Sequence, residues 1–286
     1  MPIRTTRLEY PAHGGCALRR TRALLSAAMV RAPVELYLQR DQPEGVPPLS
    51  LTGERTLPDV PEENYWFRRH LVVYEWIAAR AHGRRVVDLA CGEGYGSAVL
   101  GRTAASVVGV DANPEAHEHA RLKYTGEKVR FERTMIELWR GDADCVVFLQ
   151  TIEHVQDPDA VLEAIREQIG PGGVAYVSTP NVLTLAPKGA ERSGNPWHVH
   201  EYRPDEYREL CERHFSSVDM LGLFHARKLR AHQWAIEHAG WDSIHRALRF
   251  TTPFYDRFTP AISVRDFTLR RGRLEGALDF LAVLRP

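Results

Sequence analysis

The sequence predicts an α/β fold with a doubly wound, mostly parallel sheet and helices on both faces. From residue 85 onward, short apolar runs rich in β-branched residues alternate with segments of helical periodicity. The apolar runs are continuous, which is typical of parallel strands buried on both faces. Strands joined by helices favour right-handed crossovers, and this constrains the topology.

The alternation begins after a helix predicted over residues 64–82, where NYWFRRHLVVYEWIAARAH has apolar residues at helical spacing. Gly83 follows in the position where helices usually end. Strands are predicted over 85–90 and 106–110, with a helix over 95–102 between them. Further strands are predicted over 128–132, 144–149 and 174–178.

Two more helices are predicted between these strands. Pro114 opens the first, since proline suits the first turn of a helix. Asp157 and Pro158 start the second, which runs to Ile169 and stops at the GPGG turn of residues 170–173.

The last third of the chain is less regular. A helix is expected over 204–214 and a strand over 217–223. Residues 226–258 are rich in Arg, His, Trp and Phe and predict a helical insertion. SVRD at 263–266 has the pattern of a capping box, and residues 277–284 alternate into a final strand.

The composition bounds the class of protein. The 286 residues are 44% apolar and 26% charged, with 37 basic and 37 acidic residues, so nothing favours nucleic acid or an anionic membrane as a partner. No apolar run approaches the ~18 residues of a membrane-spanning helix. The cysteines (Cys16, Cys91, Cys145 and Cys211) show no CxxC spacing. We therefore expect reduced thiols in a cytoplasmic protein, with an oligomeric state that the sequence does not determine.

We expect residues 1–49 to be a partly disordered extension before a domain over 50–286. Arg31 interrupts the apolar stretch near the start, and no small-x-small cleavage site follows, so export is disfavoured. The proline-rich segment 41–64 predicts a linker or an irregular arm.

The stretch VVDLACGEGYG predicts a ligand site. Its pattern, D-x-x-x-G-x-G-x-G from Asp88 to Gly96, fails the dinucleotide fingerprint GxGxxG and lacks the lysine of a phosphate-binding loop. Gly92 and Gly94 remove side chains where a ligand can approach the backbone. Asp111 ends the next strand, where its carboxylate can accept hydrogen bonds from both hydroxyls of a ribose.

VVDLACGEGYG, with VGVD at 108–111, resembles the glycine loop of the class I S-adenosylmethionine methyltransferases. The resemblance implies a Rossmann-like sheet with an antiparallel last strand, S-adenosyl-L-methionine as cofactor and S-adenosyl-L-homocysteine as product. It places Met135 and Ile136 around the adenine, Thr134 or Glu137 at the adenine amino group and Gln150 under the methionine moiety. The cofactor contacts so implied are Asp88, Ala90, Gly92, Glu93, Gly94, Asp111, Ala112, Thr134, Met135, Ile136 and Gln150.

Three further segments indicate one subgroup of these methyltransferases: the arm LTGERTLPDVPEENYWFRRH, STPN at 178–181 and NPWHVHEYRPDEY at 195–207. These segments are similar to the bacterial sugar O-methyltransferases of methylglucose lipopolysaccharide synthesis. The similarity covers residues 50–286 and implies methyl transfer to a saccharide hydroxyl. We assign the acceptor-binding cap to residues 224–262.

Such a transfer needs a group that takes the hydroxyl proton. His198 is our candidate base, with His154 and His200 as alternatives and Glu201 or Asp205 as the carboxylate that orients it. In the competing interpretation this loop only closes over the cofactor. A required Mg²⁺ is less favoured, because no compact carboxylate cluster with ligand spacing is evident.

Residues before and within the first helix are further cofactor candidates. Arg55, and Arg68 or Arg69, could pair with the cofactor carboxylate, and Tyr65 and Trp66 could pack on its sulfonium. Two other functions stay open: O-methylation of a phenol, quinol or other small molecule, and a non-catalytic scaffold that binds the cofactor. The intact glycine loop and Asp111 count against the scaffold.

Overall fold

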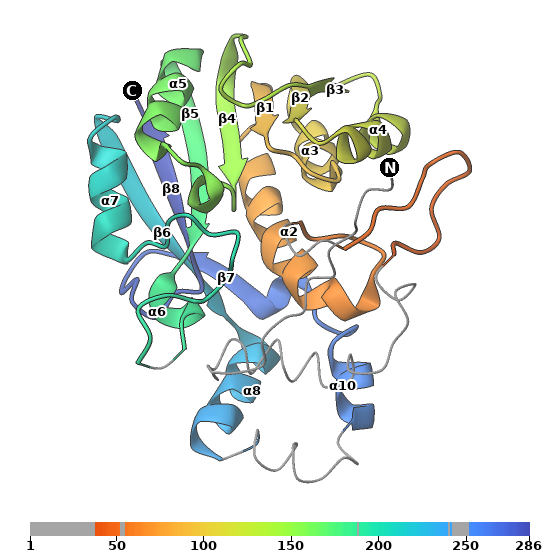
Figure 1. Cartoon of the computed structure of the whole chain (residues 1–286), viewed down its shortest axis with the longest axis vertical. Helices are drawn as coiled ribbons and strands as arrows, with labels where there is room; N and C mark the ends of the chain where they lie inside the picture. The colour runs from red at the N-terminus through yellow and green to blue at the C-terminus, as the bar shows by residue number, and fades with distance from the viewer. Residues whose placement is uncertain (1–37, 52–54, 188, 240, 242–251) are drawn as a thin grey trace, which may run out of the picture.

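The computed structural model describes residues 38–51, 55–187, 189–239, 241 and 252–286. Within these ranges the strands form one eight-stranded sheet of order β3-β2-β1-β4-β5-β8-β6-β7. Helices cover both of its faces (Figure 1). The α/β fold expected from the sequence is confirmed.

The sheet is parallel on one side and antiparallel on the other. Strands β1 to β5 pair in parallel. Strand β8 runs antiparallel to β5, with Ser178 opposite Leu281, so the last strand is antiparallel as expected. The strands are β1 Arg85–Leu89, β2 Ser106–Asp111, β3 Val129–Arg133, β4 Ala143–Leu149, β5 Ile169–Pro180, β6 Ser217–His225, β7 Phe267–Arg270 and β8 Asp279–Arg285.

Helices α4 and α5 begin at side-chain caps. The Asn113 side chain accepts hydrogen bonds from the N–H groups of Glu115 and Ala116, and Asp157 accepts one from Ala160. The helices are η2 Pro61–Glu63, α2 Asn64–Ala78, α3 Tyr95–Gly101, α4 Pro114–Tyr124, η3 Ile152–His154, α5 Pro158–Gln168, α6 Val182–Leu185, α7 Pro204–Glu212, α8 Arg227–His238, α10 Thr252–Phe258 and η5 Val264–Asp266.

Three local predictions differ from the structure. The GPGG segment is an irregularity inside β5, because Ala143 pairs with Ile169 and Cys145 with Val174; glycines accommodate such bulges. Helix α2 ends at Ala78, earlier than predicted. The edge strand β7 was not predicted, since four residues carry too little periodicity to identify a strand.

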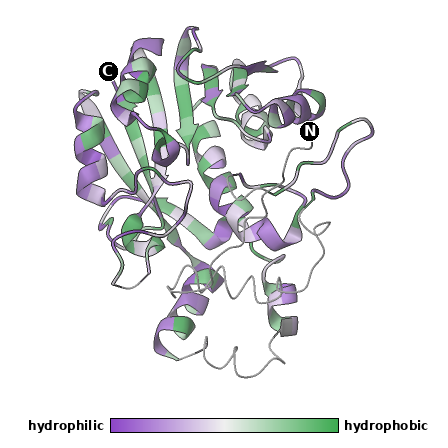
Figure 2. Cartoon of the chain, in the orientation of Figure 1, coloured by the Kyte–Doolittle hydropathy of each residue, from purple (hydrophilic) through white to green (hydrophobic). Residues whose placement is uncertain are grey.

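Two apolar layers hold the sheet. Helices α5 and α7 cover one face, where the buried Tyr207 donates to the carbonyl of Val177 at 3.0 Å. Helices α2 and α3 cover the other face through residues such as Ile77 and Leu100. Figure 2 shows the strands as the most apolar part of the chain. No helix in the described part of the chain is long and apolar enough to cross a bilayer.

The fold gathers loops at one edge of the sheet. The parallel strands point toward the same edge, and α6, α8 and α10 lie beyond it (Figure 1). Strand β1 lies between β2 and β4, so the chain order reverses there. Such a reversal creates a crevice at the carboxyl ends of the strands. Most of the expected N-terminal extension, residues 1–37, lies outside the described residues.

Candidate active site

A cavity of about 360 Å³ opens at the carboxyl edge of the sheet. The ends of β1, β2 and β4 line it, together with α2 and the first residue of β8. The lining residues are Arg55, Thr56, His70, Val73, Tyr74, Ala90, Cys91, Gly92, Glu93, Tyr95, Asp111, Ala112, Asn113, Ala116, Leu149, Gln150, Thr151, His154, Ser178 and Asp279. Of the predicted site residues, eight line it: Arg55, Ala90, Gly92, Glu93, Asp111, Ala112, Gln150 and His154.

The three glycines of the loop have different roles. Gly92 has a φ of +56°, and a methyl group added there would meet no atom within 4 Å. A methyl group on Gly94 would lie 2.7 Å from Cβ of Ala120, and one on Gly96 would lie 2.1 Å from the ring of Tyr74. Gly92 therefore leaves space at the cavity, while Gly94 and Gly96 allow α3 to pack closely.

Asp111 joins the two loops that border the cavity. Its Oδ2 accepts a hydrogen bond from the N–H of Gly92 at 2.8 Å, and its Oδ1 accepts one from Asn113 at 2.8 Å. Each carboxylate oxygen can accept a further hydrogen bond. The side chain can therefore hold the glycine loop and receive ligand hydroxyls at the same time.

Asp88 lies beneath the loop and outside the cavity lining. It is fully buried and accepts hydrogen bonds from the hydroxyls of Ser97 (2.7 Å) and Tyr74 (3.2 Å). Burial raises the pKa of the Asp88 carboxyl to about 7. These contacts make Asp88 a support for the glycine loop.

Glu93 borders the cavity, but its carboxylate is occupied by neighbouring side chains. It is 1% exposed and accepts hydrogen bonds from Gln39, His119, Lys123 and Tyr124 at 2.9 to 3.0 Å. Gln39 comes from the arm before α2. Glu93 therefore links this arm to the glycine loop.

Two strand ends carry unusual backbone at the cavity. Ala90 after β1 has a φ of +56°, and Gln150 after β4 has a φ of +52°. Non-glycine residues rarely adopt this conformation, and such residues cluster at functional sites. Gln150 is held there by Ser178, which accepts hydrogen bonds from the Gln150 backbone and side chain at 3.0 to 3.1 Å.

His154 ends the short helix η3 and reaches the cavity. Its Nδ1 lies 2.9 Å from the carbonyl of Trp197, which fixes Nδ1 as the donor and leaves the lone pair on Nε2 in the neutral ring. The neighbouring Glu153 is 2% exposed and accepts a hydrogen bond from Thr179 at 3.2 Å. Burial raises the pKa of Glu153 to about 8.

His198 packs behind His154. The two rings lie 5.1 Å apart between centroids, and Nδ1 of His198 lies 2.9 Å from Oε1 of Glu201. Glu201 is thus the carboxylate that orients this imidazole. Nε2 of His200 lies 3.4 Å from the carbonyl of Gln156. Neither His198 nor His200 is among the residues that line the cavity.

Tyr65 and Arg69 do not reach the cavity either. The hydroxyl of Tyr65 lies 2.7 Å from Nε2 of His225, and the Arg69 guanidinium makes two hydrogen bonds to Asp279, at 2.7 and 2.5 Å. Asp279 does line the cavity, although no sequence pattern identified it, since it begins a strand 210 residues after Arg69.

The three residues expected around the adenine also lie apart from this cavity. Thr134, Met135 and Ile136 follow β3, and none is among the lining residues. Met135 is 52% exposed, and Ile136 packs against the apolar layer under α5. His70 and Ser178, which do line the cavity, were not predicted, because helical and strand periodicity alone made them core residues.

Comparisons with known proteins agree with this architecture. Residues 63–241 match the family model described as a methyltransferase domain. The chain is 42% identical over 184 residues to a probable S-adenosylmethionine-dependent methyltransferase of Mycolicibacterium smegmatis, covering 63% of this chain and 71% of the relative. It is 30% identical over 177 residues to a ubiquinone biosynthesis O-methyltransferase of Aromatoleum aromaticum, covering 52% of this chain and 72% of that relative.

A solved structure shows the same fold. A methyltransferase of Thermotoga maritima, described as a possible histamine N-methyltransferase, aligns with a TM-score of 0.53 at 16% identity, covering 79% of this chain and 96% of the other. The family model spans well over half of the chain, and the glycine loop and Asp111 lie inside the matched region. The chain therefore belongs to the methyltransferase domain family and is an S-adenosylmethionine-dependent methyltransferase.

Proposed function

We propose that the chain transfers the methyl group of S-adenosylmethionine to a hydroxyl of a saccharide. One observation carries this proposal: His154, in a fixed tautomer, lies in the cavity beside the polar side chains of Thr151, Ser178 and Asp279. A sugar hydroxyl is too weak an acid to ionise at neutral pH, so its proton must be taken or displaced during transfer. Side chains that accept and donate hydrogen bonds suit an acceptor with several hydroxyls.

The lining of the cavity supports its assignment to the cofactor. Gly92 leaves open space, and Asp111 can accept hydrogen bonds from the ribose hydroxyls. Gln150, at the end of β4, is proposed to lie against the methionine portion. When bound, S-adenosylmethionine supplies an electrophilic methyl group on sulfur. The chain's part is to hold the acceptor oxygen in line and to remove its proton.

Asp111→Asn is expected to weaken binding of S-adenosylhomocysteine by about 10- to 100-fold. The amide would place an N–H₂ donor against the N–H of Gly92 or Asn113, so one of the two hydrogen bonds is lost. Hydrogen bonds to charged groups contribute about 1.5–3 kcal/mol each. Isothermal titration measures the change. Glu115→Gln, an exposed charge change on α4, is the control, and unchanged affinity in Asp111→Asn would contradict the assigned role.

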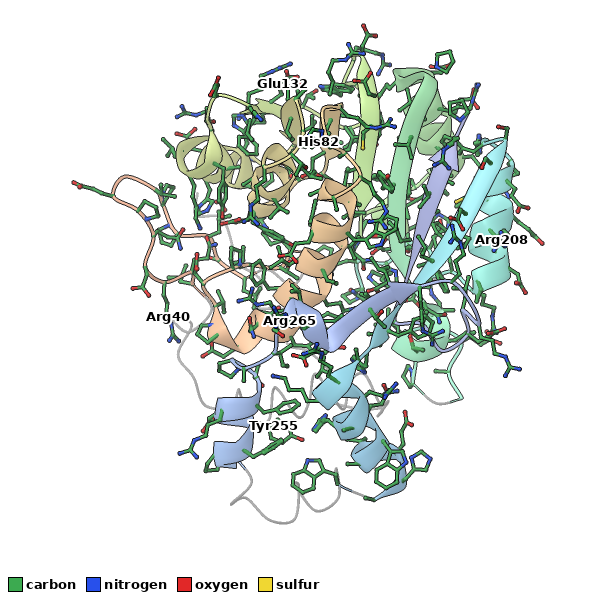
Figure 3. The ribbon with its side chains drawn as sticks, turned by 180° about the vertical axis from the view of Figure 1, so that it is seen from behind. Arg40, His82, Glu132, Arg208, Tyr255 and Arg265 are labelled. Atoms are coloured by element: carbon green, nitrogen blue, oxygen red, sulfur yellow. The ribbon has the colours of Figure 1, made fainter. Side chains whose placement is uncertain are left out.

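The cap over this edge is proposed to bind the rest of the saccharide. Helices α8 and α10 meet through His232, whose ring lies 4.9 Å from Phe258 and 5.7 Å from Tyr255. Figure 3 shows Tyr255 between these helices. Trp234 is 60% exposed and stacks on His238 through one face of its ring, with 5.5 Å between centroids. Its other face is proposed to receive a sugar ring.

A second candidate is O-methylation of a phenol or quinol. The similarity to ubiquinone biosynthesis O-methyltransferases favours it, since their name implies an aromatic acceptor. Both reactions form an O-methyl product, and both use the glycine loop and Asp111 to bind the cofactor.

An acceptor panel separates the two candidates. The chain is incubated with methyl-labelled S-adenosylmethionine and either α-linked gluco- and manno-oligosaccharides or phenols and quinols. Label on a saccharide supports the proposal. Label on phenols alone would replace the saccharide with an aromatic acceptor.

A further inference from the structure

We propose that Glu153, His154 and His198 form a binding site for a divalent transition-metal ion at the edge of the cavity. One nitrogen or oxygen of each residue lies within 4.8 Å of the others. Oε1 of Glu153 is 3.9 Å from Nε2 of His154. Ligand atoms that each lie about 2.0–2.2 Å from one ion are separated from one another by distances only somewhat shorter than these. Small side-chain movements therefore suffice to bring all three onto the ion.

The two imidazoles are held as metal-ligating histidines usually are. Such a histidine donates its other ring N–H to a carboxylate or a backbone carbonyl. Nδ1 of His154 lies 2.9 Å from the carbonyl of Trp197, and Nδ1 of His198 lies 2.9 Å from Oε1 of Glu201. In these tautomers the lone pairs of both rings lie on Nε2.

The carboxylate ligand is also fixed. Glu153 is buried, and its Oε2 accepts a hydrogen bond from the hydroxyl of Thr179 at 3.2 Å. Its Oε1 points toward His154. All three candidate ligands therefore have a partner that sets their orientation.

The backbone brings His198 to the other two ligands. The N–H groups of Val199 and His200 donate to the carbonyl of Glu153 at 2.8 and 3.0 Å. This pairing ties the loop after α6 to η3, across about 45 residues of sequence. Nδ2 of Asn195 lies 2.9 Å from Nε2 of His198 and donates a hydrogen bond to it. An ion that binds Nε2 replaces the Asn195 amide as the partner of this nitrogen.

The ligand set selects the class of ion. Two imidazoles and one carboxylate suit Zn²⁺, Mn²⁺, Fe²⁺ or Co²⁺, whereas Mg²⁺ prefers oxygen ligands. Three protein ligands leave positions open for a substrate oxygen. The sequence showed no such cluster, because Glu153 and His154 are adjacent while His198 comes from a distant loop.

The catalytic part of this inference rests on the proposed O-methylation. His154 lines the cavity, so an ion on its Nε2 can bind the acceptor hydroxyl and increase its acidity. With the ion bound, His154 acts through the ion and does not itself accept the proton, because its one lone pair is on the metal. The hydroxyl proton passes to water, the oxygen electron pair forms the new O–CH₃ bond, and the C–S bond breaks onto sulfur. Ion and acceptor thus meet at the same edge of the cavity.

Ion binding is tested on the untagged full chain after treatment with EDTA and dialysis. Titration with Co²⁺, followed by its visible absorption and by elemental analysis, is expected to give one ion per chain. Glu153→Gln and His198→Ala are each expected to weaken binding by at least 10- to 100-fold. Glu153→Gln keeps the shape of a buried side chain, and His198→Ala is a second variant should the first fail to fold. The exposed His82→Ala is the control.

Two results would overturn the site: no bound Co²⁺ in the wild-type chain, or equal binding in the wild type and both variants. Methyl transfer is measured in parallel, with EDTA and after Mn²⁺, Zn²⁺ or Co²⁺ is restored. Full transfer to a hydroxyl in EDTA would overturn the role of the ion and leave the proposed function standing. Stoichiometric ion binding with no transfer to any hydroxyl would support the site and refute the O-methylation.

Discussion

His154→Ala is expected to lower kcat by about 10²- to 10⁴-fold, the usual contribution of a group that handles the reacting proton. Of the three candidate histidines, His154 is the one that lines the cavity, and the carbonyl of Trp197 fixes its tautomer. The affinity for S-adenosylhomocysteine is expected to be unchanged, because the glycine loop and Asp111 are held by contacts that do not involve His154. Steady-state kinetics and titration calorimetry measure the two quantities.

The exposed His82→Ala serves as the control for this variant. His82 follows α2, and in Figure 3 it lies at the opposite end of the molecule from Tyr255 of the cap. Its kcat is expected to equal that of the wild type. A His154→Ala enzyme with full turnover would contradict the role assigned to this residue, and a similar loss in His198→Ala alone would move that role to the loop after α6.

Arg69→Leu is expected to lower the free energy of unfolding by about 3–5 kcal/mol, as when one partner of a buried ion pair is removed. The guanidinium of Arg69 is 1% exposed and binds both carboxylate oxygens of Asp279, and it also donates to the carbonyl of Leu278 at 2.9 Å. Without Arg69, the Asp279 charge is buried unpaired between α2 and β8. Urea denaturation measures the loss.

The matched control is Arg271→Leu. Arg271 also makes two hydrogen bonds to a carboxylate, that of Asp219, but its side chain is 74% exposed. Solvent screens such a pair, so little change in the urea midpoint is expected. Equal midpoints for Arg69→Leu and the wild type would show that the Arg69–Asp279 pair does not stabilise the fold.

The parallel strands, two of the helices and the glycine loop could be predicted because the sequence patterns that identify them are local. Continuous apolar runs identified the parallel strands, and Asn113 and Asp157 cap the helices that their sequences predicted. The glycine spacing and Asp111 predicted a site that two neighbouring parallel strands bring together. Each of these inferences needs only a few consecutive residues.

The rest of the site, including other expected cofactor contacts, could not be predicted in the same way, because it depends on contacts between distant segments. Arg69 was expected at the cofactor carboxylate, yet it pairs with Asp279, 210 residues later. Thr134, Met135 and Ile136 were placed by resemblance alone, and the cavity does not include them. Glu201 was one of two carboxylates expected to orient a histidine of this loop, and it contacts His198. The pairing of the loop with Glu153 depends on tertiary structure.

The most direct test of the central claim is to identify the atom that receives the methyl group. The chain is supplied with ¹³C-methyl S-adenosylmethionine and α-linked gluco- and manno-oligosaccharides, and the products are examined by NMR. Saccharide O-methylation predicts a labelled methyl carbon bonded to a carbohydrate oxygen, formed by the wild type and lost in His154→Ala. Label on nitrogen, on carbon or on a phenolic oxygen alone would contradict it.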